Sequence, residues 1–204
     1  MVSRTLPAKG SKAETRRSQV IEAARACFGE SGFHGASMAQ IAAAAGMSVG
    51  QIYRHFPSKE AVIAAIVEQG VAEKIDHIAA MESAARENGQ DLAAASAQVS
   101  GPGPSDPGDD LRRAALTLEI VAEAARNPAV AGIVQRSDAI VAARAAEMIA
   151  GARPHWSPER VRTVVQVIAA LYEGWTLRAI ADPGALSPQA EQLRADLIAH
   201  VMQP

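Results

Sequence analysis

The chain has 204 residues, enough for one compact domain or for a small domain and a larger one. Apolar residues make up 49% of it, only 3% are aromatic, and alanine is abundant, which favours helices and argues against sheets. The net charge of −2 alone decides nothing about nucleic acid. We therefore expect an all-α protein with a substantial apolar core.

Charge is distributed unevenly along the chain. Residues 1–60 contain eight Lys and Arg against four Asp and Glu, a local charge of +4, whereas the rest contains twelve against eighteen, a charge of −6. A basic end on an acidic body is expected when that end meets phosphate, although many protein surfaces are equally uneven. Residues 1–12 are predicted to form a flexible basic arm, which either lies along a nucleic acid or is a disordered tail.

Several classes of protein are disfavoured by the sequence. The single cysteine, Cys27, cannot form an internal disulfide and lies among apolar residues, so we expect a buried thiol in a reducing compartment. No stretch reaches the roughly 18 uninterrupted apolar residues of a membrane span, and the N-terminus lacks the apolar core of a signal peptide. The five histidines are scattered, without metal-ligand spacing or a nucleophile–base pair. We expect a cytoplasmic protein that has no membrane contact, metal, cofactor or catalytic site.

The first sixty residues predict three helices. Apolar residues recur at helical spacing from about Ala13 to Ser31, Gly32 ends this helix, and Phe33 is expected to plug a small core. Ser37 is a suitable N-cap for a short helix that reaches Ala45. After the break at Gly46, a third helix starts at its N-cap Ser48 and runs to about His55, where Phe56-Pro57 ends it.

The remaining sequence predicts a larger helical bundle. A long helix is expected from its cap at Ser58 to about Arg86, with a stop at Asn88-Gly89 and a further helix near 90–99. The run from Gly101 to Gly108 is rich in Gly and Pro and predicts a mobile loop or a lid. Further helices are predicted over residues 111–126, 129–152, 159–181 and 188–202.

Two short helices joined by a tight turn that contains Gly46 predict a helix-turn-helix. Ala42, Ala45 and Gly46 are small enough for the two helices to approach closely. Apolar pins are supplied by Ile41, Met47, Ile52 and Phe56. The second helix can then expose one face to the major groove of DNA, made of Val49, Gly50, Gln51, Tyr53 and Arg54.

The run IAAAAGMSVGQIYRHFPSKEAV resembles the N-terminal domain of TetR-type transcriptional regulators. The resemblance covers residues 13–66 and includes the spacing Gly-x-Ser-x-Gly-x-x-Tyr-x-x-Phe-x-x-Lys-Glu; the rest of the chain matches only in length, helix count and a terminal helical pair. It implies about nine helices, a DNA-binding domain over 13–60 and a ligand-binding and dimerisation domain over 61–204. It further implies an Ω-shaped homodimer in which the last two helices form a four-helix interface.

Each candidate DNA contact has an alternative structural role. Ser37 and Ser48 can hold phosphate oxygens, cap their helices, or do both. By resemblance, Tyr53 and His55 are phosphate contacts, and Lys59 stands at the start of the fourth helix. Tyr53 can instead pack on the first helix, while His55 and Lys59 can be merely solvated. The remaining candidates are Gln51 for adenine, Val49 for a thymine methyl, Arg54 for phosphate or guanine, and Gly50 for close backbone approach.

The resemblance also implies an apolar cavity in the C-terminal domain, whose ligand moves the DNA-binding domains apart. Polar residues in otherwise apolar helices are candidates to line it, or are simply the solvated faces of those helices. They are Glu119, Glu123, Gln135, Arg136 and Asp138. His77 and Met81 face the same choice between core and cavity, and the Ala, Val, Ile and Leu surroundings favour an apolar ligand.

Two broad apolar stripes at the end of the chain suggest a self-complementary dimer interface. The first contains Val164, Val165, Ile168, Leu171, Tyr172 and the anchor candidate Trp175, and the second contains Leu193, Leu197, Ile198 and Val201. Trp156, beside a proline-rich turn, either covers the cavity or caps the bundle.

Together these features predict a homodimeric repressor that binds a palindromic operator in double-stranded DNA and is released by a small apolar ligand. A helical adaptor without DNA binding and a ligand-independent DNA-binding protein of the same fold are the alternatives. The absence of a catalytic constellation argues against a small all-α enzyme. The sequence does not identify the ligand or operator, nor distinguish a repressor from an activator.

Overall fold

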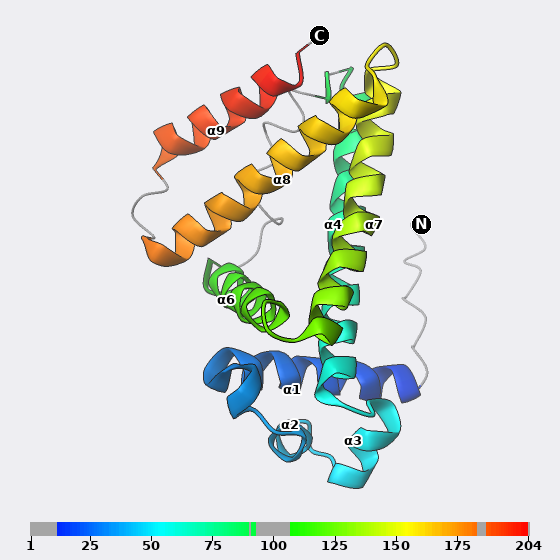
Figure 1. Ribbon diagram of the computed structural model, residues 1–204, viewed down its shortest axis with the longest axis vertical. Coiled ribbons are helices and arrows are strands. Elements are labelled where there is room, and N and C mark those ends of the chain that lie inside the picture. Colours follow the sequence, from blue (N-terminus) through cyan, green and yellow to red (C-terminus); the bar gives the residue numbers. More distant parts are fainter. Residues whose placement is uncertain (1–11, 90, 93–106, 183–186, 204) are drawn as a thin grey trace, which may run out of the picture. The chain divides into compact units, whose positions relative to one another are not determined.

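The computed structural model describes residues 12–89, 91–92, 107–182 and 187–203, apart from the side chains of 107–110, and all its regular elements are helices (Figure 1). The described residues group into two compact units, Met1–Ile66 and Val67–Pro204. The predicted helix near 90–99 lies almost wholly outside the described residues, as does the loop over 101–106. Pro107 and Gly108, expected in that loop, instead begin a helix, and proline suits a first helical turn because its missing N–H is not needed there.

The first unit contains α1 (Lys12–Gly35), α2 (Met38–Ala44), α3 (Val49–His55) and the start of α4 (Lys59–Glu87). Its core extends into the first two turns of α4, up to Ile66. The most deeply buried side chains of this core are Val20, Ile21, Phe28, Ile41, Ile52, Phe56, Val62 and Ile63.

A glycine breaks α1 where the sequence predicts its end. Gly32 has φ 68° and ψ 172°, a conformation outside the helical region that is nearly restricted to glycine. The break allows the following residue, Phe33, to turn inward, where it is 5% exposed and its ring lies 5.6 Å from that of Phe28. Phe33 is therefore the core plug that the sequence predicts.

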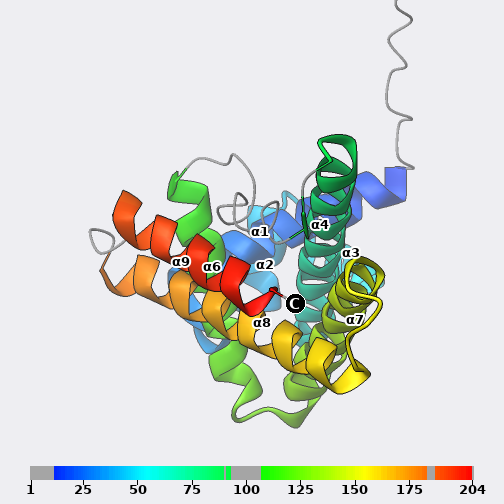
Figure 2. The same cartoon turned by 90° about the horizontal axis from the view of Figure 1, so that it is seen from above.

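The second unit contains the rest of α4 together with α6 (Pro107–Ala124), α7 (Pro128–Ala152), α8 (Pro158–Ala181) and α9 (Pro188–Val201). The last three helices start in the same way: Asn127, Ser157 and Ser187 accept backbone N–H bonds as N-caps, and a proline follows each. Both views show α8 and α9 running side by side (Figures 1 and 2).

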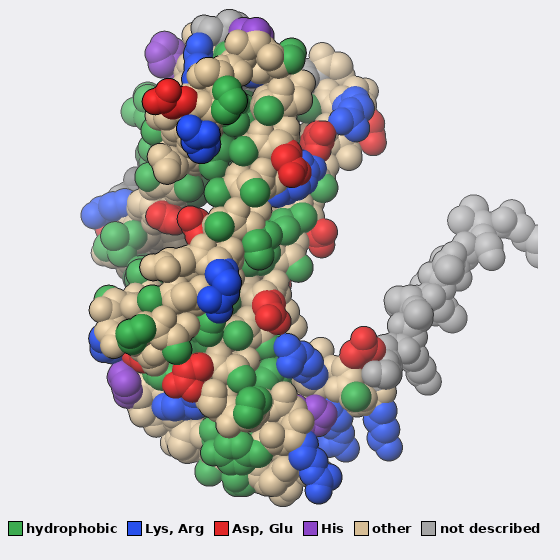
Figure 3. All heavy atoms as spheres, turned by 45° about the vertical axis from the view of Figure 1, so that its right-hand side comes forward, with side chains coloured by type: hydrophobic (Ala, Val, Ile, Leu, Met, Phe, Trp, Pro, Cys, Tyr) green, Lys and Arg blue, Asp and Glu red, His purple; other side chains and the backbone are tan. Residues whose placement is uncertain are grey.

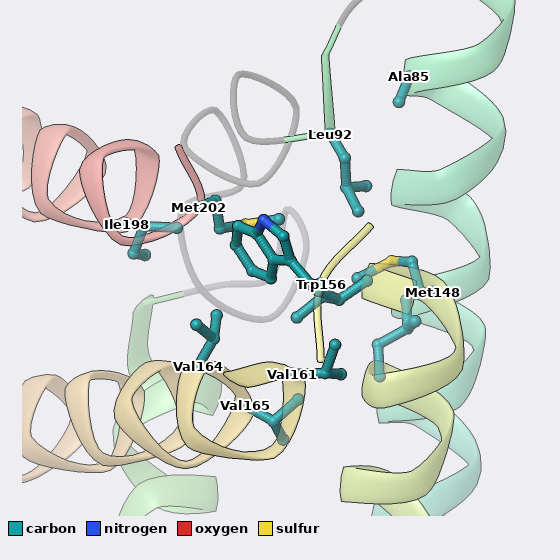
Figure 4. Packing of buried hydrophobic residues seen from close by; sticks show 11 residues of the cluster. Ala85, Leu92, Met148, Trp156, Val161, Val164, Val165, Ile198 and Met202 are labelled. Atoms are coloured by element: carbon teal, nitrogen blue, oxygen red, sulfur yellow. The ribbon is translucent and has the colours of Figure 1, made fainter. Parts of the chain in front are cut away.

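An apolar cluster around Trp156 forms the core of the second unit (Figure 4). It joins α4, the residue Leu92, α7, α8 and α9, and its other members include Ile78, Met148, Ile149, Val161, Ile198 and Met202. Trp156 is 8% exposed and belongs to this cluster. This placement agrees with the second of its two predicted roles, that of capping the bundle.

Two arginines, the C-cap Arg153 of α7 and Arg160 in the first turn of α8, hold the end of the described chain after α9, an arrangement that we call the C-terminal latch. The Nε of Arg153 donates to the carbonyl of Met202 at 3.0 Å, and its Nη2 lies 2.7 and 2.9 Å from the carboxylate oxygens of Asp91. Arg160 donates to the carbonyl of Gln203 at 2.8 Å and stacks on the ring of Trp156 with its Cζ 4.0 Å from the centroid. The carbonyls of the C-cap residue of α9 and of the residue after it are thereby satisfied.

One helix of the described chain, α8, has the length and mean hydropathy of a membrane span. Packing in the second unit accounts for part of this apolarity, because Val161, Val164 and Val165 are buried in the cluster around Trp156. A core helix of a globular domain has the same composition, so the hydropathy of α8 is weak support for membrane insertion.

Candidate nucleic-acid interface

Both helices of the predicted motif begin with a reciprocal capping box. In α2 the Oγ of Ser37 accepts from the backbone N–H of Gln40 at 3.2 Å, and the Oε1 of Gln40 accepts from the backbone N–H of Ser37 at 2.7 Å. In α3 the same pair of bonds joins Ser48 and Gln51, at 3.3 and 2.9 Å. Both serines therefore act as caps, and both are exposed, so their backbone N–H groups and hydroxyls stand at the surface.

The turn between α2 and α3 depends on glycine. Gly46 has φ 64°, in the left-handed region that an L side chain adopts only at a cost of about 1–2 kcal/mol. The chain then closes with a bond of 2.9 Å from the N–H of Met47 to the carbonyl of Ala42. The conformation of Gly46 and this hydrogen bond together fix the direction in which α3 leaves the turn.

One side of α3 is held by the core and the other is free. Ile52 and Phe56 are 0% and 1% exposed, and Ile41 and Met47 from the preceding residues are 0% and 8% exposed. The four predicted apolar pins are therefore confirmed. On the opposite side Val49, Gly50, Gln51, Tyr53 and Arg54 are exposed, with Val49 at 43% and Tyr53 at 50%.

This free face is unusual for its apolar and aromatic content at the surface. At such exposure about half of the valine and of the tyrosine remains accessible to a partner. Figure 3 shows basic side chains gathered with a histidine near the start of α1, on the first unit. His55, at the end of α3, is half-buried.

Lys59 has a role that sequence reasoning did not predict. Its Nζ donates to the carbonyls of Phe33 and Ala36 at 2.8 and 2.9 Å and lies 4.4 Å from the centroid of the Phe33 ring. The side chain is half-buried, so it is not merely solvated. An ammonium group has three donors, and two of them are used to join the start of α4 to the segment immediately before the Ser37 cap.

The structure gives different surroundings to the seven residues that were candidates to line a ligand cavity. Gln135 and Asp138 are exposed on α7, as is Arg136, so they form a solvated face. Glu123 is 1% exposed, but its carboxylate accepts from Arg126 and Asn127 at 3.0 Å each and closes the C-terminus of α6. For Gln135, Arg136 and Asp138 these placements agree with the alternative of a solvated helix face.

The three other candidates, His77, Met81 and Glu119, are half-buried. Met81 packs against the cluster around Trp156. Burial lowers the pKa of His77, which favours the neutral imidazole. His77 and Met81 lie one turn apart on α4 and therefore share a face of that helix.

The apolar stripes of α8 and α9 divide between core and surface. Val164 and Val165 are 5% and 7% exposed within the core, which corrects the expectation that they form a dimer interface. Ile168, Leu171, Tyr172 and Val201 are half-buried and pack against the same core. Leu193 and Leu197 are 61% and 45% exposed, and α8 adds two exposed residues that the sequence analysis missed, Val167 and Leu177.

Trp175 takes part in a polar network between α8 and α9. Its Nε1 donates to Glu191 at 2.8 Å, and Glu191 also pairs with the guanidinium of Arg194 at 3.0 Å. Arg194 is 2% exposed and lies over the rings of Tyr172 and Trp175, at 5.3 and 5.6 Å from their centroids. The network fixes the pairing of the two helices.

Comparison with known proteins agrees with this geometry. Residues 20–66 match the model of bacterial regulatory proteins of the tetR family, and residues 104–203 match the C-terminal model of BetI-type transcriptional repressors. The HTH-type transcriptional regulator UidR of Escherichia coli K12 is 47% identical over 58 residues, which are 28% of this chain and 30% of UidR. The sequence match thus spans less than a third of that relative.

Solved structures extend the likeness to the whole fold. Salmonella enterica GusR superposes with a TM-score of 0.70 at 23% identity, covering 94% of this chain and 97% of GusR. The multidrug binding protein EbrR, complexed with proflavin, gives a TM-score of 0.58 at 20% identity, covering 91% of this chain and 99% of EbrR. The two family models lie on the two units of the fold in the expected order, and the chain therefore belongs to the TetR family of bacterial regulatory proteins.

Proposed function

We propose that this chain is a sequence-specific DNA-binding repressor, which acts as a homodimer on a palindromic operator and is released from it by a small apolar ligand. The observation that carries the proposal is the free face of α3. This helix is held on one side by Ile52 and Phe56 and presents Val49, Gln51, Tyr53 and Arg54 on the other. A short helix presented in this way fits the major groove.

Residues on this face divide into those that position the protein and those that distinguish bases. Val49 suits the methyl group of thymine, and the exposed guanidinium of Arg54 suits guanine or phosphate. Tyr53, His55 and the two capping serines suit phosphate oxygens. Gln51 uses its Oε1 in the capping box, so its NH₂ group is the part that remains available to a base or a phosphate.

Homodimer formation is supported by the exposed apolar residues of α8 and α9. Val167, Leu177, Leu193 and Leu197 are between 39% and 61% exposed, and large apolar side chains gathered on a helical pair mark a contact surface. A second copy offers the same surface, which suits a two-fold arrangement and a palindromic operator.

Release by a ligand is supported by the likeness to EbrR, whose structure contains proflavin. In the second unit, the half-buried His77 and Met81 share a face of α4 and are candidates to line such a site, since ligand sites combine apolar side chains with a few polar groups. A ligand that binds the free form more tightly than the DNA-bound form lowers the affinity for DNA by that difference. Adding candidate apolar compounds to the protein–DNA complex tests this step, and release by none of them would favour the ligand-independent alternative.

The DNA-binding function is tested by selecting duplexes from a random pool and titrating the protein against the selected and an unrelated duplex. We expect salt-dependent binding with a preference for the selected duplex. Gln51→Ala should change the base preference. Gln40→Ala is the matched control, because Gln40 holds the same capping-box position in α2 and its loss has the same cost to helix capping. If no duplex is enriched, the adaptor alternative replaces the repressor.

A further inference from the structure

The first unit has a hollow between α1 and α3. Some of the residues that line it are predicted DNA contacts and others are not. It has a volume of about 160 Å³ and is lined by Arg16, Met47, Gln51, Arg54 and His55. Water in the liquid takes about 30 Å³ per molecule, so the hollow has room for a tetrahedral anion with some of its water. Arg16 comes from α1 and is half-buried, which places a guanidinium beside the exposed face of the recognition helix.

The polar groups around this hollow are suited to donate hydrogen bonds. Arg16 and Arg54 carry donors only. Gln51 already uses its Oε1 to accept from the N–H of Ser48, so its NH₂ group remains as a donor. The imidazole of His55 supplies a further N–H, and Met47, 8% exposed, supplies an apolar side. A lining rich in hydrogen-bond donors is complementary to the oxygens of a phosphate and not to a cation.

The positive charge of the hollow is also not neutralised by the protein. None of the five lining residues carries a carboxylate, and the side chains of Arg16, Arg54 and His55 form no ion pair or hydrogen bond within the described part of the chain. Arg25, farther along α1, is different, since its guanidinium lies 3.6 Å from the carboxylate of Glu22. Two unpaired guanidiniums directed at one hollow therefore create a local positive potential that favours an anion.

We propose that this hollow binds one phosphate group of the DNA backbone, with Arg16 and Arg54 as its charged ligands. This inference rests on the proposed DNA-binding function. Backbone phosphates border the major groove that α3 would enter, and contacts to them fix the orientation of a recognition helix without reading sequence. A phosphate held by both α1 and α3 would thus set the angle at which α3 lies in the groove.

The first arm of the test compares Arg16→Gln with Arg25→Gln on the selected and the unrelated duplex over a series of salt concentrations. Both variants remove one positive charge from α1, but only Arg16 lines the hollow. Arg16→Gln should lower the affinity by about tenfold on both duplexes and reduce the slope of log K against log salt by about 0.9 for each phosphate lost. Arg25→Gln should leave the slope unchanged. Equal slopes for the two variants would overturn the proposal.

A second arm uses wild-type protein and does not depend on how the variants fold. Single phosphates of the duplex are replaced in turn by uncharged methylphosphonates. At one position in each half-site, the replacement should weaken binding of the wild-type protein about tenfold and have little further effect on Arg16→Gln, because both changes remove the same contact. If no position shows this coupling, the hollow does not hold a backbone phosphate.

A third arm separates a DNA phosphate from a free one. Inorganic phosphate is titrated into the protein without DNA while the amide resonances of residues around the hollow are followed by NMR. Saturable binding that Arg16→Gln abolishes, without any coupled methylphosphonate position, would overturn the DNA assignment in favour of a free anion. If the protein binds no duplex at all, the proposed function fails, whereas duplex binding without a coupled phosphate overturns only the inference about the hollow.

Discussion

Lys59 illustrates how a residue with the sequence context of a DNA contact can be committed to the protein itself. Its ammonium group bridges the carbonyls of Phe33 and Ala36, across a stretch that runs into the N-cap of α2. Hydrogen bonds from charged groups are stronger than those between neutral ones. Lys59 therefore positions α2, and any contact of its third donor with phosphate is additional to that role.

Replacing Lys59 by methionine should destabilise the protein more than it changes the electrostatics of DNA binding. Loss of the two bonds from a half-buried ammonium should lower the free energy of unfolding by about 1–2 kcal/mol, measured by urea denaturation. The slope of DNA affinity against salt should stay as in the wild type. Lys74→Met, on the exposed surface of the same helix, is the control for removal of a charge. A salt slope lower by about 0.9 for each Lys59 would instead show a phosphate contact.

At the scale of the secondary-structure elements, the fold requires glycine at one of two positions in the helix-turn-helix and not at the other. Gly46 holds the turn in a left-handed conformation. Gly50 lies in the helical α3, and a Cβ added there would meet no heavy atom within 4 Å. The folded unit therefore has a need for glycine at position 46 that it does not have at position 50.

Alanine at these two positions should consequently have opposite effects. Gly46→Ala should lower the stability by about 1–2 kcal/mol. Gly50→Ala should raise the stability by about 0.5–1 kcal/mol, because glycine is unfavourable in a helix. If Gly50 permits close approach of the α3 backbone to DNA, the stabilised variant should bind DNA more weakly. Thermal denaturation and anisotropy measure the two effects, and unchanged DNA affinity would show that Gly50 has no such role.

An ion pair between Glu82 on α4 and Arg144 on α7 links these two helices in the second unit. A hydrogen bond from Arg144 lowers the pKa of Glu82 below its ordinary value, with smaller contributions from the charges of Arg144 and Arg86. A carboxyl group with a lower pKa in the folded than in the unfolded state stabilises the protein above its ordinary pKa. That stabilisation is lost as the pH falls through the lower, folded value.

The free energy of unfolding should thus decrease below about pH 4.5, the ordinary value of the carboxyl group. Arg144→Met should reduce the part of this decrease that belongs to Glu82, and Glu82→Gln should remove it. Denaturation of the two single variants and the double variant between pH 3 and pH 7 measures the coupling. Because Glu82 is partly exposed, the coupling should be below about 1 kcal/mol, and its absence would show that solvent screens the pair.

Local signals in the sequence predicted most of the elements. Capping serines, the prolines that follow Ser157 and Ser187, and Gly32 and Gly46 act within a few residues, so their effects can be deduced without tertiary information. The helix boundaries at 107 and 124 differed from prediction. The sequence Asp106-Pro107 has the same cap-and-proline pattern as Ser157-Pro158 and Ser187-Pro188, but it was assigned to the Gly- and Pro-rich loop. The acceptors of Lys59 lie 23 and 26 residues away in sequence, and no local pattern indicates them.

At the scale of the whole molecule, an amphipathic pattern does not say which partner covers an apolar face. The sequence placed Val164, Val165, Leu193 and Leu197 together as a dimer surface, because each lies on an apolar stripe. The structure shows that the cluster around Trp156 buries the two valines, while the two leucines stay exposed. The hollow near Arg16 was equally hidden, since its residues come from helices more than thirty positions apart.

Dimer formation through α8 and α9 predicts that a charge at Leu197 converts the protein to a monomer. Leu197→Glu would place a carboxylate in an apolar interface, where it lacks a partner. Val121→Glu on α6 is the matched control, since Val121 is 51% exposed and Leu197 45%. Sedimentation velocity should show half the mass for the first variant only, with unchanged helical content by circular dichroism. A dimeric Leu197→Glu would place the interface elsewhere.

The C-terminal latch has a consequence for the dynamics of the chain end. The last turn of a helix ordinarily opens and closes readily, and its amide protons then exchange quickly with solvent. Here Arg153 and Arg160 hold the carbonyls of Met202 and Gln203, and Ile198 and Met202 are fully buried. We therefore expect the amide hydrogens in the final turn of α9 to exchange about as slowly as those in the middle of the helix, and faster exchange there would show that the latch does not suppress fraying.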